Sequence, residues 1–454
     1  REGSSAGGVS KDFTVSAQET TFISRNLPAI RQDESYCWCP EDYKVQVSFD
    51  LQGTQFTPNE YKPYSQKWED VDKQLLKPEN TQFGEHLSLT NPFRPETKQA
   101  YNSEMNFEEK IICAFQVLKK KMAWNGRYQL YSKELEKVIK KGSGSNADLN
   151  FILISILKDF GLEAYPVVMS RRSSGMLPYN FPSLQKLNTF FVAIHDINKQ
   201  KYVFLDSSMD VPAFNILPLE LSVNKARMLS LKEKEEKKWV NVMALSHNKS
   251  FMKIDARIEG NQVKGHRSTV LYGQEAIEYQ ANENHKQDNL VSNPENKVSQ
   301  KEKLTVTNLK VKKQENDWAL IEEEFDFVLQ ADRTDDHLYI NPMLFPQLKS
   351  NPFIQTERVL PIEFPYPYKF TMLSTLTLPE GYEVEELPQS QSIRSEGDGL
   401  QCKYMIQQQG NTILLNYVFH LKGYIFLSEQ YKQLQELWAK VIEKNNALIV
   451  LKKI

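Results

Sequence analysis

The clearest pattern of apolar positions lies near the middle of the chain. Residues 149–160 are apolar on almost every side of a helical projection, which is typical of a helix buried inside a domain. A loop rich in glycine and serine precedes this stretch and supplies Ser145 or Asn146 as an N-cap, while Gly161 ends it. Asp148 falls in the first turn, where the helix dipole favours an anion. The pattern predicts a central helix whose two ends are both encoded locally.

A strand-like pattern follows this helix. Segments 163–170, 188–195 and 202–206 have the apolar character of strands, and a polar turn joins the last two. Because these strands follow a helix rather than alternate with further helices, we predict an antiparallel α+β unit rather than a doubly wound sheet. Helical spacing also predicts helices that begin at caps Ser65 and Ser132 and extend to about 77 and 140, and a further helix from about 106 to 122.

Beyond residue 246 the apolar positions recur mostly at every second residue. The density of short strands and turns up to residue 368 predicts a β-sandwich. Residues 281–303 are rich in Asn, Gln, Lys and Glu and are expected to form an exposed excursion. A final unit adds an amphipathic helix over 428–444 and a last strand at 447–451. The other expected strands are 251–258, 263–272, 304–313, 319–329, 369–378, 382–387, 401–408 and 412–421.

The N-terminal region also alternates in a β manner. Strands are expected at 13–15, 20–23 and 43–51, with prolines as punctuation. Together, the changes of pattern along the chain predict four domains. Their expected boundaries are 1–62, 63–245, 246–368 and 369–454.

Composition excludes several classes of function. The chain has 454 residues, a formal charge of -2 and a pI of about 6.5, so it lacks the basic field that nucleic-acid binding leaves in a sequence. Its apolar runs are far shorter than the roughly 20 residues of a membrane helix, so no membrane span is expected. The chain begins at Arg1 without an initiator methionine, which leaves export open.

The cysteines and histidines do not form a metal-binding pattern. Cys37, Cys39, Cys113 and Cys402 have neither the spacing of a disulfide framework nor that of a zinc site. The seven histidines do not repeat at metal-ligand spacing, so we expect no metal and no cofactor. Candidate chemistry lies instead at the loop before the central helix. First-turn amides and the helix dipole lower a thiol's pKa there and can form part of an oxyanion hole.

The sequence at this loop resembles the transglutaminase-like superfamily, whose catalytic logic is papain-like. The family pattern is Gly-x-Cys-x-Asp/Glu at the start of a buried helix, then a His on a following strand and an Asp on the next. Residues 144–148 fit this frame with Asn146 in place of the cysteine, and Thr189 stands at the histidine position. Asp206 matches the acid. The resemblance implies an α+β, cysteine-proteinase-type core with a degenerate catalytic triad.

Further short motifs resemble one group of bacterial proteins in which β domains of unknown function flank the transglutaminase-like unit. The resemblance implies that residues 1–62 are the remnant of an N-terminal β domain, and that antiparallel β domains follow the core. It also implies export to the periplasm or cell surface of a Gram-negative bacterium. The motifs lie at 25–30, 41–43, 124–128, 341–342, 351–353, 357–362, 378–382 and 449–453.

The substitutions at the triad positions predict a loss of catalysis. An amide side chain is neither a usable nucleophile nor a general base, and threonine cannot shuttle a proton near neutral pH. The first hypothesis is therefore a pseudoenzyme that binds or scaffolds an unknown protein, peptide or glycan, with peptides or glycans of the cell envelope as the ligands that the family implies. The residues expected at its cleft are Trp124, Ser145, Asp148, Asn188, Arg171 and Arg172.

Two other hypotheses stay open from the sequence. One is an active amidohydrolase, peptidase or acyltransferase whose nucleophile is Ser143, Ser145 or Cys113. The other is a structural linker without a ligand. A simpler explanation also exists for two site residues, because Asn146 and Asp148 are residue types that commonly cap a helix and complement its dipole.

Overall fold

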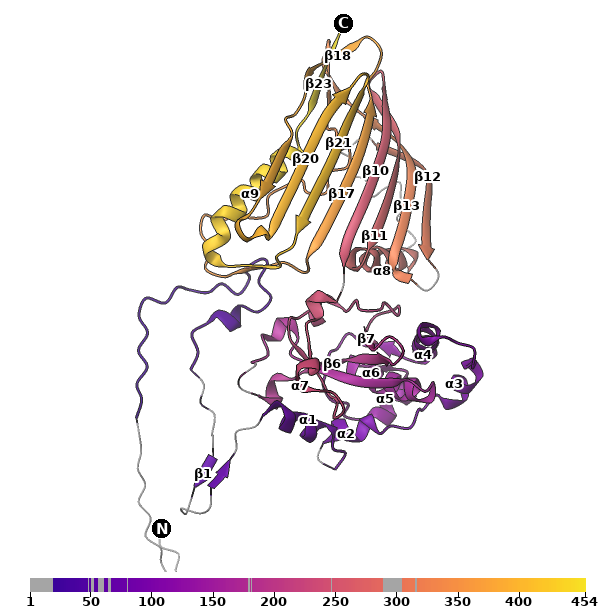
Figure 1. Cartoon of the computed structure of the whole chain (residues 1–454), viewed down its shortest axis with the longest axis vertical. Coiled ribbons are helices and arrows are strands. Elements are labelled where there is room, and N and C mark those ends of the chain that lie inside the picture. The colour runs from indigo at the N-terminus through magenta and orange to yellow at the C-terminus, as the bar shows by residue number, and fades with distance from the viewer. Residues whose placement is uncertain are drawn as a thin grey trace, which may run out of the picture.

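The computed structural model describes residues 19–47, 49, 53–55, 61–63, 67–79, 81–178, 180, 182–245, 247–288, 304–314 and 317–454. Figure 1 shows two parts that follow one another along the long axis. Residues 67–245 form helices around a five-stranded sheet, and residues 247–454 contain an eight-stranded sheet. The molecule thus contains both helices and largely antiparallel sheets, which agrees with the predicted α+β class.

The predicted central helix is α6, Asn146–Asp159, and every residue from Asn146 to Leu157 is buried. Ser145 is its N-cap. The Ser145 hydroxyl accepts from the Asp148 N–H, and the Asp148 carboxylate accepts from the Ser145 N–H at 2.7 Å, which makes a capping box. Gly161 follows the helix with φ +74°, a left-handed conformation that favours glycine. The prediction for this helix is confirmed at both ends.

Several shorter helices surround α6. They are α1 (Trp68–Leu76), α2 (Gln82–Leu87), α3 (Arg94–Ala100), α4 (Phe107–Lys121) and α5 (Leu135–Lys141). Helices α2, α3 and α4 contact α6 directly. The prediction that Ser132 caps a helix is wrong, because α5 begins three residues later, after Glu134. The predicted cap Ser65 lies outside the described residues.

The five-stranded sheet has the order β7-β6-β5-β8-β9 and is antiparallel throughout. Its register pairs Met169 with Thr189 and Val192 with Leu205. Helix α6 packs on β5 and β6, so the starts of α6 and β6 meet the end of β7. The strands are β5 (Glu163–Met169), β6 (Thr189–Asp196), β7 (Lys201–Leu205), β8 (Ala226–Met228) and β9 (Trp239–Val240), with a separate pair β3 (Ala123–Trp124) and β4 (Ser143–Gly144).

A buried ion cluster ties α1 to this sheet. Arg227 on β8 donates to both carboxylate oxygens of Asp72, at 2.6 and 2.7 Å, and to those of Glu235, at 2.6 and 3.0 Å. Lys238 of α7 (Glu235–Lys238) donates to Asp72 at 3.0 Å. We call Asp72, Arg227, Glu235 and Lys238 the ion cluster.

The eight-stranded sheet has the order β12-β13-β11-β10-β17-β21-β20-β19. Strands β10 and β17 are parallel neighbours, while the other pairs are antiparallel. Tyr368, expected to end one domain, begins β17, so the stretches predicted as two separate β domains contribute strands to one sheet. The strands are β10 (Asn248–Glu259), β11 (Gln262–Tyr272), β12 (Leu304–Gln314), β13 (Asp317–Gln330), β17 (Tyr368–Thr377), β19 (Gln391–Arg394), β20 (Leu400–Gln409) and β21 (Thr412–Leu421).

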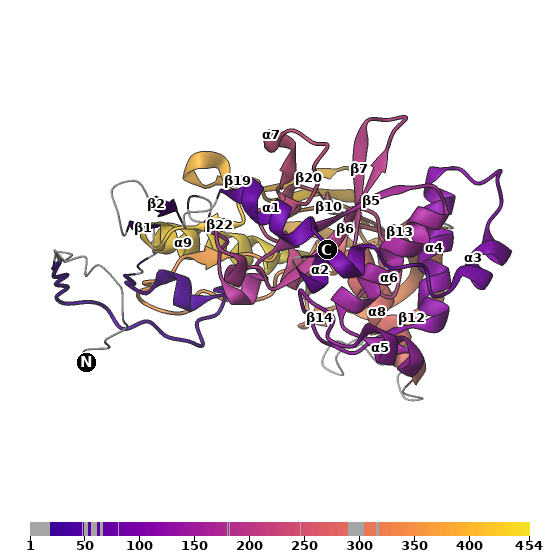
Figure 2. The same ribbon diagram turned by 90° about the horizontal axis from the view of Figure 1, so that it is seen from below.

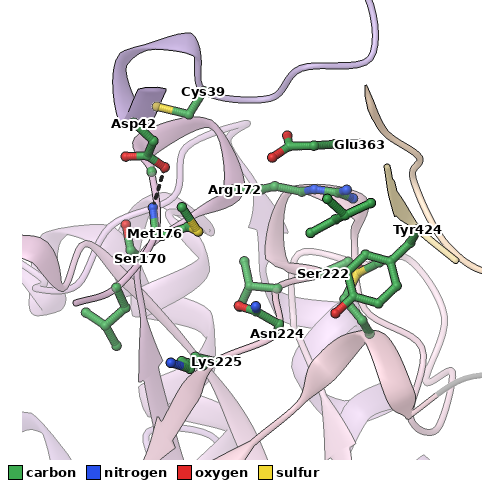
Figure 3. Close-up of a pocket in the computed structure, with 15 residues that line it drawn as sticks. Cys39, Asp42, Ser170, Arg172, Met176, Ser222, Asn224, Lys225, Glu363 and Tyr424 are labelled. Atoms are coloured by element: carbon green, nitrogen blue, oxygen red, sulfur yellow. Dashed lines mark hydrogen bonds between the residues drawn. The ribbon is translucent and has the colours of Figure 1, made fainter. Parts of the chain in front are cut away.

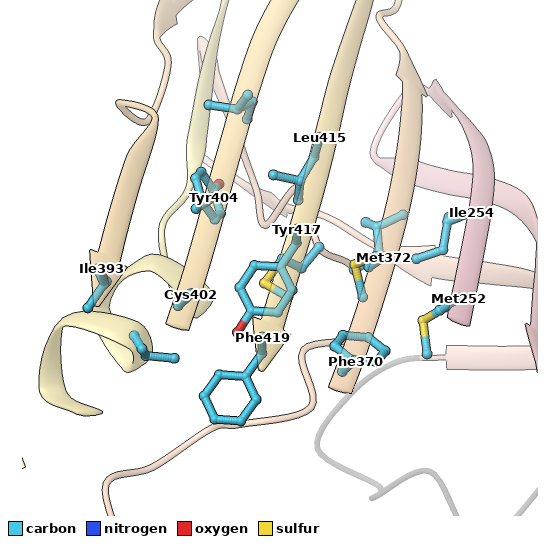
Figure 4. Close-up of a cluster of buried hydrophobic side chains, with 14 of the residues drawn as sticks. Met252, Ile254, Phe370, Met372, Ile393, Cys402, Tyr404, Leu415, Tyr417 and Phe419 are labelled. Carbon is cyan, nitrogen blue, oxygen red and sulfur yellow. The ribbon is translucent and has the colours of Figure 1, made fainter. Parts of the chain in front are cut away.

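One face of this large sheet covers a core that both predicted β domains share. β10 alternates strictly between buried and exposed residues, as a strand with one buried face should. Figure 4 shows Met252 of β10 beside Phe370 and Met372 of β17, with Tyr417 and Phe419 of β21. Helix α9 (Tyr431–Asn445) and a four-stranded sheet pack against the same core. That sheet contains β14 (Asp332–Arg333), β15 (His337–Ile340), β23 (Ile449–Lys453) and β18 (Tyr382–Glu386).

Two further sequence predictions differ from the structure. The expected excursion at 281–303 begins within helix α8, Gln274–Asp288, which packs on β10, β11 and β13, while 289–303 lie outside the described residues. The expected strand at 20–23 does not form, and neither does the described part, 43–47, of the strand expected at 43–51, because Pro40–Tyr43 is a short 3-10 helix and the flanking chain is irregular. The strand expected at 13–15 lies outside the described residues. Alternation alone did not decide these segments, since a strand also needs a partner strand. Among the described residues, no helix combines the length and apolarity needed to cross a membrane.

An N-terminal segment connects the two parts of the molecule. We call residues 34–46 the strap. It runs on the side opposite α3 and α4 (Figure 2). Tyr36 packs between Phe353 and Phe364, and its carbonyl accepts from the Glu363 N–H at 2.7 Å. Glu363 belongs to β16 (Ile362–Glu363), which pairs with β22 (Ile425–Phe426). A further short pair, β1 (Gly53–Gln55) and β2 (Tyr61–Pro63), follows the strap.

Candidate functional site

The three positions that the family resemblance singles out lie together at the N-terminus of α6. Asn146 is the first residue of α6, Thr189 is the first residue of β6, and Asp206 directly follows β7. The Asn146 amide donates to the Thr189 hydroxyl at 2.8 Å and to Asp206 Oδ2 at 3.4 Å. It also donates to the backbone carbonyl of Phe190 at 3.0 Å. Residues 43 and 60 positions apart in sequence are thus in direct contact.

Asn150, one turn further along α6, completes the contacts. Its amide donates to Asp206 Oδ2 at 2.9 Å, and its side-chain oxygen accepts from the Ser207 N–H at 2.9 Å. The other carboxylate oxygen of Asp206 accepts from the Ser208 N–H at 2.9 Å and from the Ser208 hydroxyl. Both oxygens of Asp206 therefore have two donors each. We call Asn146, Asn150, Thr189, Asp206 and Ser208 the amide network.

The amide network is closed to solvent. Asn146, Asn150 and Thr189 are 0% exposed and Asp206 is 1% exposed. The chain segment 127–129 lies over Asn146, because the Gln129 N–H donates to Asn146 Oδ1 at 2.9 Å and the Asn146 N–H donates to the Arg127 carbonyl at 3.0 Å. Asn146, Thr189 and Asp206 therefore meet inside the protein rather than along the wall of an open cleft.

Asp206 is the single carboxyl group of the amide network. Burial raises the pKa of Asp206, and the hydrogen bonds from Ser208, Asn150 and Asn146 oppose that rise. Burial also lowers the pKa of Lys119, whose ammonium donates to the Ser207 carbonyl at 3.0 Å. The other network members are amides and hydroxyls, so no acid and base pair exists within it.

The off-frame nucleophile candidates lie in different surroundings. The Ser145 hydroxyl donates to Asp148 Oδ2 at 2.7 Å, so it forms part of the helix cap. Cys113 lies on α4, where its thiol donates to the Ala100 carbonyl at 3.6 Å. His86 packs on Phe151 with a ring separation of 5.2 Å. Burial lowers the pKa of His86, and Glu85 and Asp148 oppose this. No histidine side chain hydrogen-bonds to Ser145 in the described part of the chain.

The predicted cleft residues fall into two groups. Trp124 donates to the Arg127 carbonyl at 3.1 Å and packs on Tyr128, whose hydroxyl lies 3.4 Å from that of Ser208. Arg171 lies over the Tyr128 ring at 6.0 Å, so these residues cover the outer side of the amide network. The Asn188 side chain accepts from the Arg171 N–H at 3.0 Å. Sequence reasoning missed Asn150 and Ser208 and did not assign Tyr128 to the site, although Tyr128 ends the motif at 124–128. Asn150 lies inside the apolar helix pattern, and Ser208 lies in a turn, where serine is common.

Arg172 instead points toward the strap and the large-sheet unit. Its guanidinium donates to the carbonyls of Phe364 and Pro365 at 2.7 and 2.8 Å and lies 4.3 Å from the ring centre of Trp38. Burial lowers the pKa of Arg172 to about 10, and Glu363 opposes this. Arg172 is therefore neither a solvated cation nor a free anion-binding group.

A pocket lies where the strap, the end of β5 and the large-sheet unit meet. It encloses an empty volume of about 560 Å³, part of it open to solvent. We call it the junction pocket. Figure 3 shows polar side chains from all three parts around this space, and the ones that matter here are Asp42, Ser170, Arg172, Asn224, Glu363 and Tyr424.

The junction pocket depends on close backbone packing at Gly175. This residue has φ +93°, and a side chain there would collide with the Asp42 carboxylate. Asp42 accepts from the Met176 N–H at 2.7 Å, which fixes the strap on the loop after β5. The lining of this pocket does not include Asn146, Thr189 or Asp206, although Ser170 follows the ladder partner of Thr189.

Comparisons with known proteins identify one region by family. Residues 336–451 match the family described as "Domain of Unknown Function with solved-structure structure" (DUF3858), which covers the C-terminal part of the large-sheet unit. No curated protein matches the chain.

One solved structure is similar to this chain. It is described as the crystal structure of a "putative protease" from Parabacteroides distasonis ATCC 8503. The similarity has a TM-score of 0.49 and 12% sequence identity, and it covers 81% of this chain and 57% of that chain. The chain thus spans less than two thirds of the length of that protein.

Proposed function

We propose that residues 63–245 are a transglutaminase-like unit that has lost its catalytic chemistry, and that the protein acts as a non-catalytic binding or scaffold module. The observation that supports this proposal is the closed amide network. Asn146 occupies the first position of α6, where an active relative would carry a thiol, and its amide donates to Thr189 and Asp206. The contacts keep the arrangement of a triad without its nucleophile and base.

The proposed ligands are peptides or glycans of the cell envelope, and the proposed location is the periplasm or surface of a Gram-negative bacterium. Support for both comes from the family resemblance in the sequence. A binding role also fits the geometry, because the junction pocket is open to solvent while the amide network is not.

The test of this proposal restores the missing groups. In the double variant Asn146→Cys/Thr189→His, the new thiol lies at the helix N-terminus beside an imidazole that Asp206 can orient. We expect its pKa to lie below that of the single variant Asn146→Cys, in which burial opposes the thiolate and only the helix dipole favours it. Because position 146 is buried, the thiolate is measured by its ultraviolet absorbance against pH, relative to the wild type with its four native thiols.

Two outcomes would contradict the proposal. Equal thiol pKa values in the single and double variants would mean that position 189 does not face position 146 as a base would. Turnover of peptide, amide or glutamine-donor substrates by the wild type, abolished by Ser145→Ala, would favour the active enzyme with an off-frame nucleophile.

A further inference from the structure

The junction pocket contains a polar group that the protein itself leaves unused. The Ser170 side chain is 2% exposed, yet its hydroxyl has no hydrogen-bond partner among the described residues. An unsatisfied buried hydroxyl is costly, and such groups in native structures commonly serve a ligand or water. Ser170 lines the junction pocket, so a ligand that enters the pocket can supply the missing partner.

The four charged side chains of the pocket lining are Asp42, Glu363, Arg172 and Lys225, and each of them already has a partner. Glu363 accepts from the Tyr43 hydroxyl at 2.6 Å and from the Trp38 N–H at 2.8 Å. Asp42 accepts from Met176, and Arg172 donates to two backbone carbonyls. A charged ligand would therefore lose its hydration without gaining a free counter-charge. The pocket favours an uncharged polar ligand.

The remaining wall of the pocket is aliphatic. Val223, Met243 and Leu177 line it, and Met176 and Ile425 lie at its rim, 57% and 42% exposed. Tyr424 is the one aromatic side chain of the lining. Aliphatic side chains around a few hydrogen-bonding groups suit a branched apolar side chain on an amide backbone better than the hydroxylated face of a sugar.

We propose that the junction pocket binds an uncharged peptide segment that places an aliphatic side chain against Val223 and Met243 and a backbone amide against Ser170. This inference rests on the proposed binding role and narrows its ligand from peptide or glycan to peptide. The site joins the strap to both parts of the molecule, so the ligand would contact residues far apart in sequence.

The test uses the full chain and ligand-observed NMR titrations. The probes are acetyl-Gly-Leu-Gly-amide, the same peptide with Asp or Lys in place of Leu, and an oligomer of N-acetylglucosamine. We expect the Leu peptide to bind and the charged peptides to bind more weakly. In Ser170→Ala, which removes only the hydroxyl, affinity for the Leu peptide should fall about three- to tenfold, the range for one hydrogen bond.

The matched control is Ser132→Ala. The Ser132 hydroxyl is also buried and without a partner in the described structure, but Ser132 lies outside the pocket, so this substitution should leave affinity unchanged. Asn224→Ala, on the exposed side of the pocket, provides a second variant that does not disturb the core. It too should weaken binding of the Leu peptide.

Three outcomes would overturn the inference. The Leu peptide does not bind, or it binds Ser170→Ala and wild type with equal affinity, or the sugar oligomer binds instead and Ser170→Ala weakens that binding. These results would leave the loss of catalysis standing, since that proposal is tested separately by thiol pKa and turnover.

Discussion

The ion cluster on the five-stranded sheet is buried apart from Glu235, and the amide network at the start of α6 is buried too, but they hold very different amounts of charge. Asp72 and Arg227 are 1% and 0% exposed, and each charge faces at least one opposite charge within 3.0 Å. In the amide network, Asp206 is surrounded by neutral donors from Asn146, Asn150 and Ser208.

The difference shows up in the pKa values of the two sites. Burial disfavours the charged form of Arg227, but Glu235 and Asp72 more than offset this, so its pKa is raised. At Asp206 burial also disfavours the charged form, which for an acid raises the pKa, and the neutral donors offset this only in part. The ion cluster therefore stabilises its charges, whereas the amide network holds one charge among neutral hydrogen-bond donors.

The largest expected effect comes from breaking the ion cluster. Arg227→Met leaves Asp72 buried beside Lys238 alone, and we expect a loss of about 3–5 kcal/mol in the free energy of unfolding. The measurement is denaturant unfolding followed by tryptophan fluorescence, because Trp68 and Trp239 flank the guanidinium at 5.7 and 5.0 Å.

The control for this prediction is Lys232→Met. Lys232 pairs with Glu163 at 2.8 Å, but its side chain is 72% exposed, so its removal should not shift the transition measurably. An equal effect of the two substitutions would mean that burial does not distinguish the ion cluster from a surface pair.

A smaller effect is expected from neutralising the amide network. The carboxylate of Asp206 accepts from Ser208 with one oxygen and from Asn146 and Asn150 with the other. In Asp206→Asn the side chain has only one acceptor oxygen, so at least one buried donor loses its partner. The expected loss is about 1–3 kcal/mol. Unfolding free energies of variant and wild type are compared at several pH values.

The raised pKa of Asp206 also predicts how the stability deficit of Asp206→Asn changes with pH. The folded pKa of Asp206 is raised, so the folded wild type binds more protons than the unfolded chain between the ordinary carboxyl pKa and the raised value. Its stability contribution falls as pH rises through that window, and the deficit of Asp206→Asn should therefore shrink. Asp210→Asn, whose side chain is 84% exposed, should keep the wild-type pH profile. A deficit that grows with pH would contradict the raised pKa.

The smallest effect is expected at Thr189. Thr189→Val removes the hydroxyl that accepts from the Asn146 amide at 2.8 Å, but this amide still donates to the Phe190 carbonyl at 3.0 Å. We expect a loss of about 1 kcal/mol by thermal or chemical unfolding. Thr305→Val on the exposed side of β12 should have no measurable effect. A loss as large as that of Asp206→Asn would mean that the network depends on each of its contacts equally.

Much of the first unit could be predicted because its signals are local. Ser145, Asp148 and Gly161 form a capping box and a left-handed end within a few residues of α6, and the strands at 163–169, 189–196 and 201–205 lie within one or two residues of their predicted limits. The meeting of Asn146, Thr189 and Asp206 was expected from the family resemblance, not from the hydrophobic pattern.

The amino-acid sequence by itself determined the helix ends, the alternation of β10 and the absence of a thiol at position 146 and of an imidazole at position 189. Tertiary structure decided what those residues face. The parallel pairing of β10 with β17, the cover of segment 127–129 over Asn146, and the bond from Trp38 to Glu363 across 325 residues all join distant parts of the chain. Local periodicity reports which side of an element is buried, but not which partner buries it. The junction pocket exists only because three such distant segments meet.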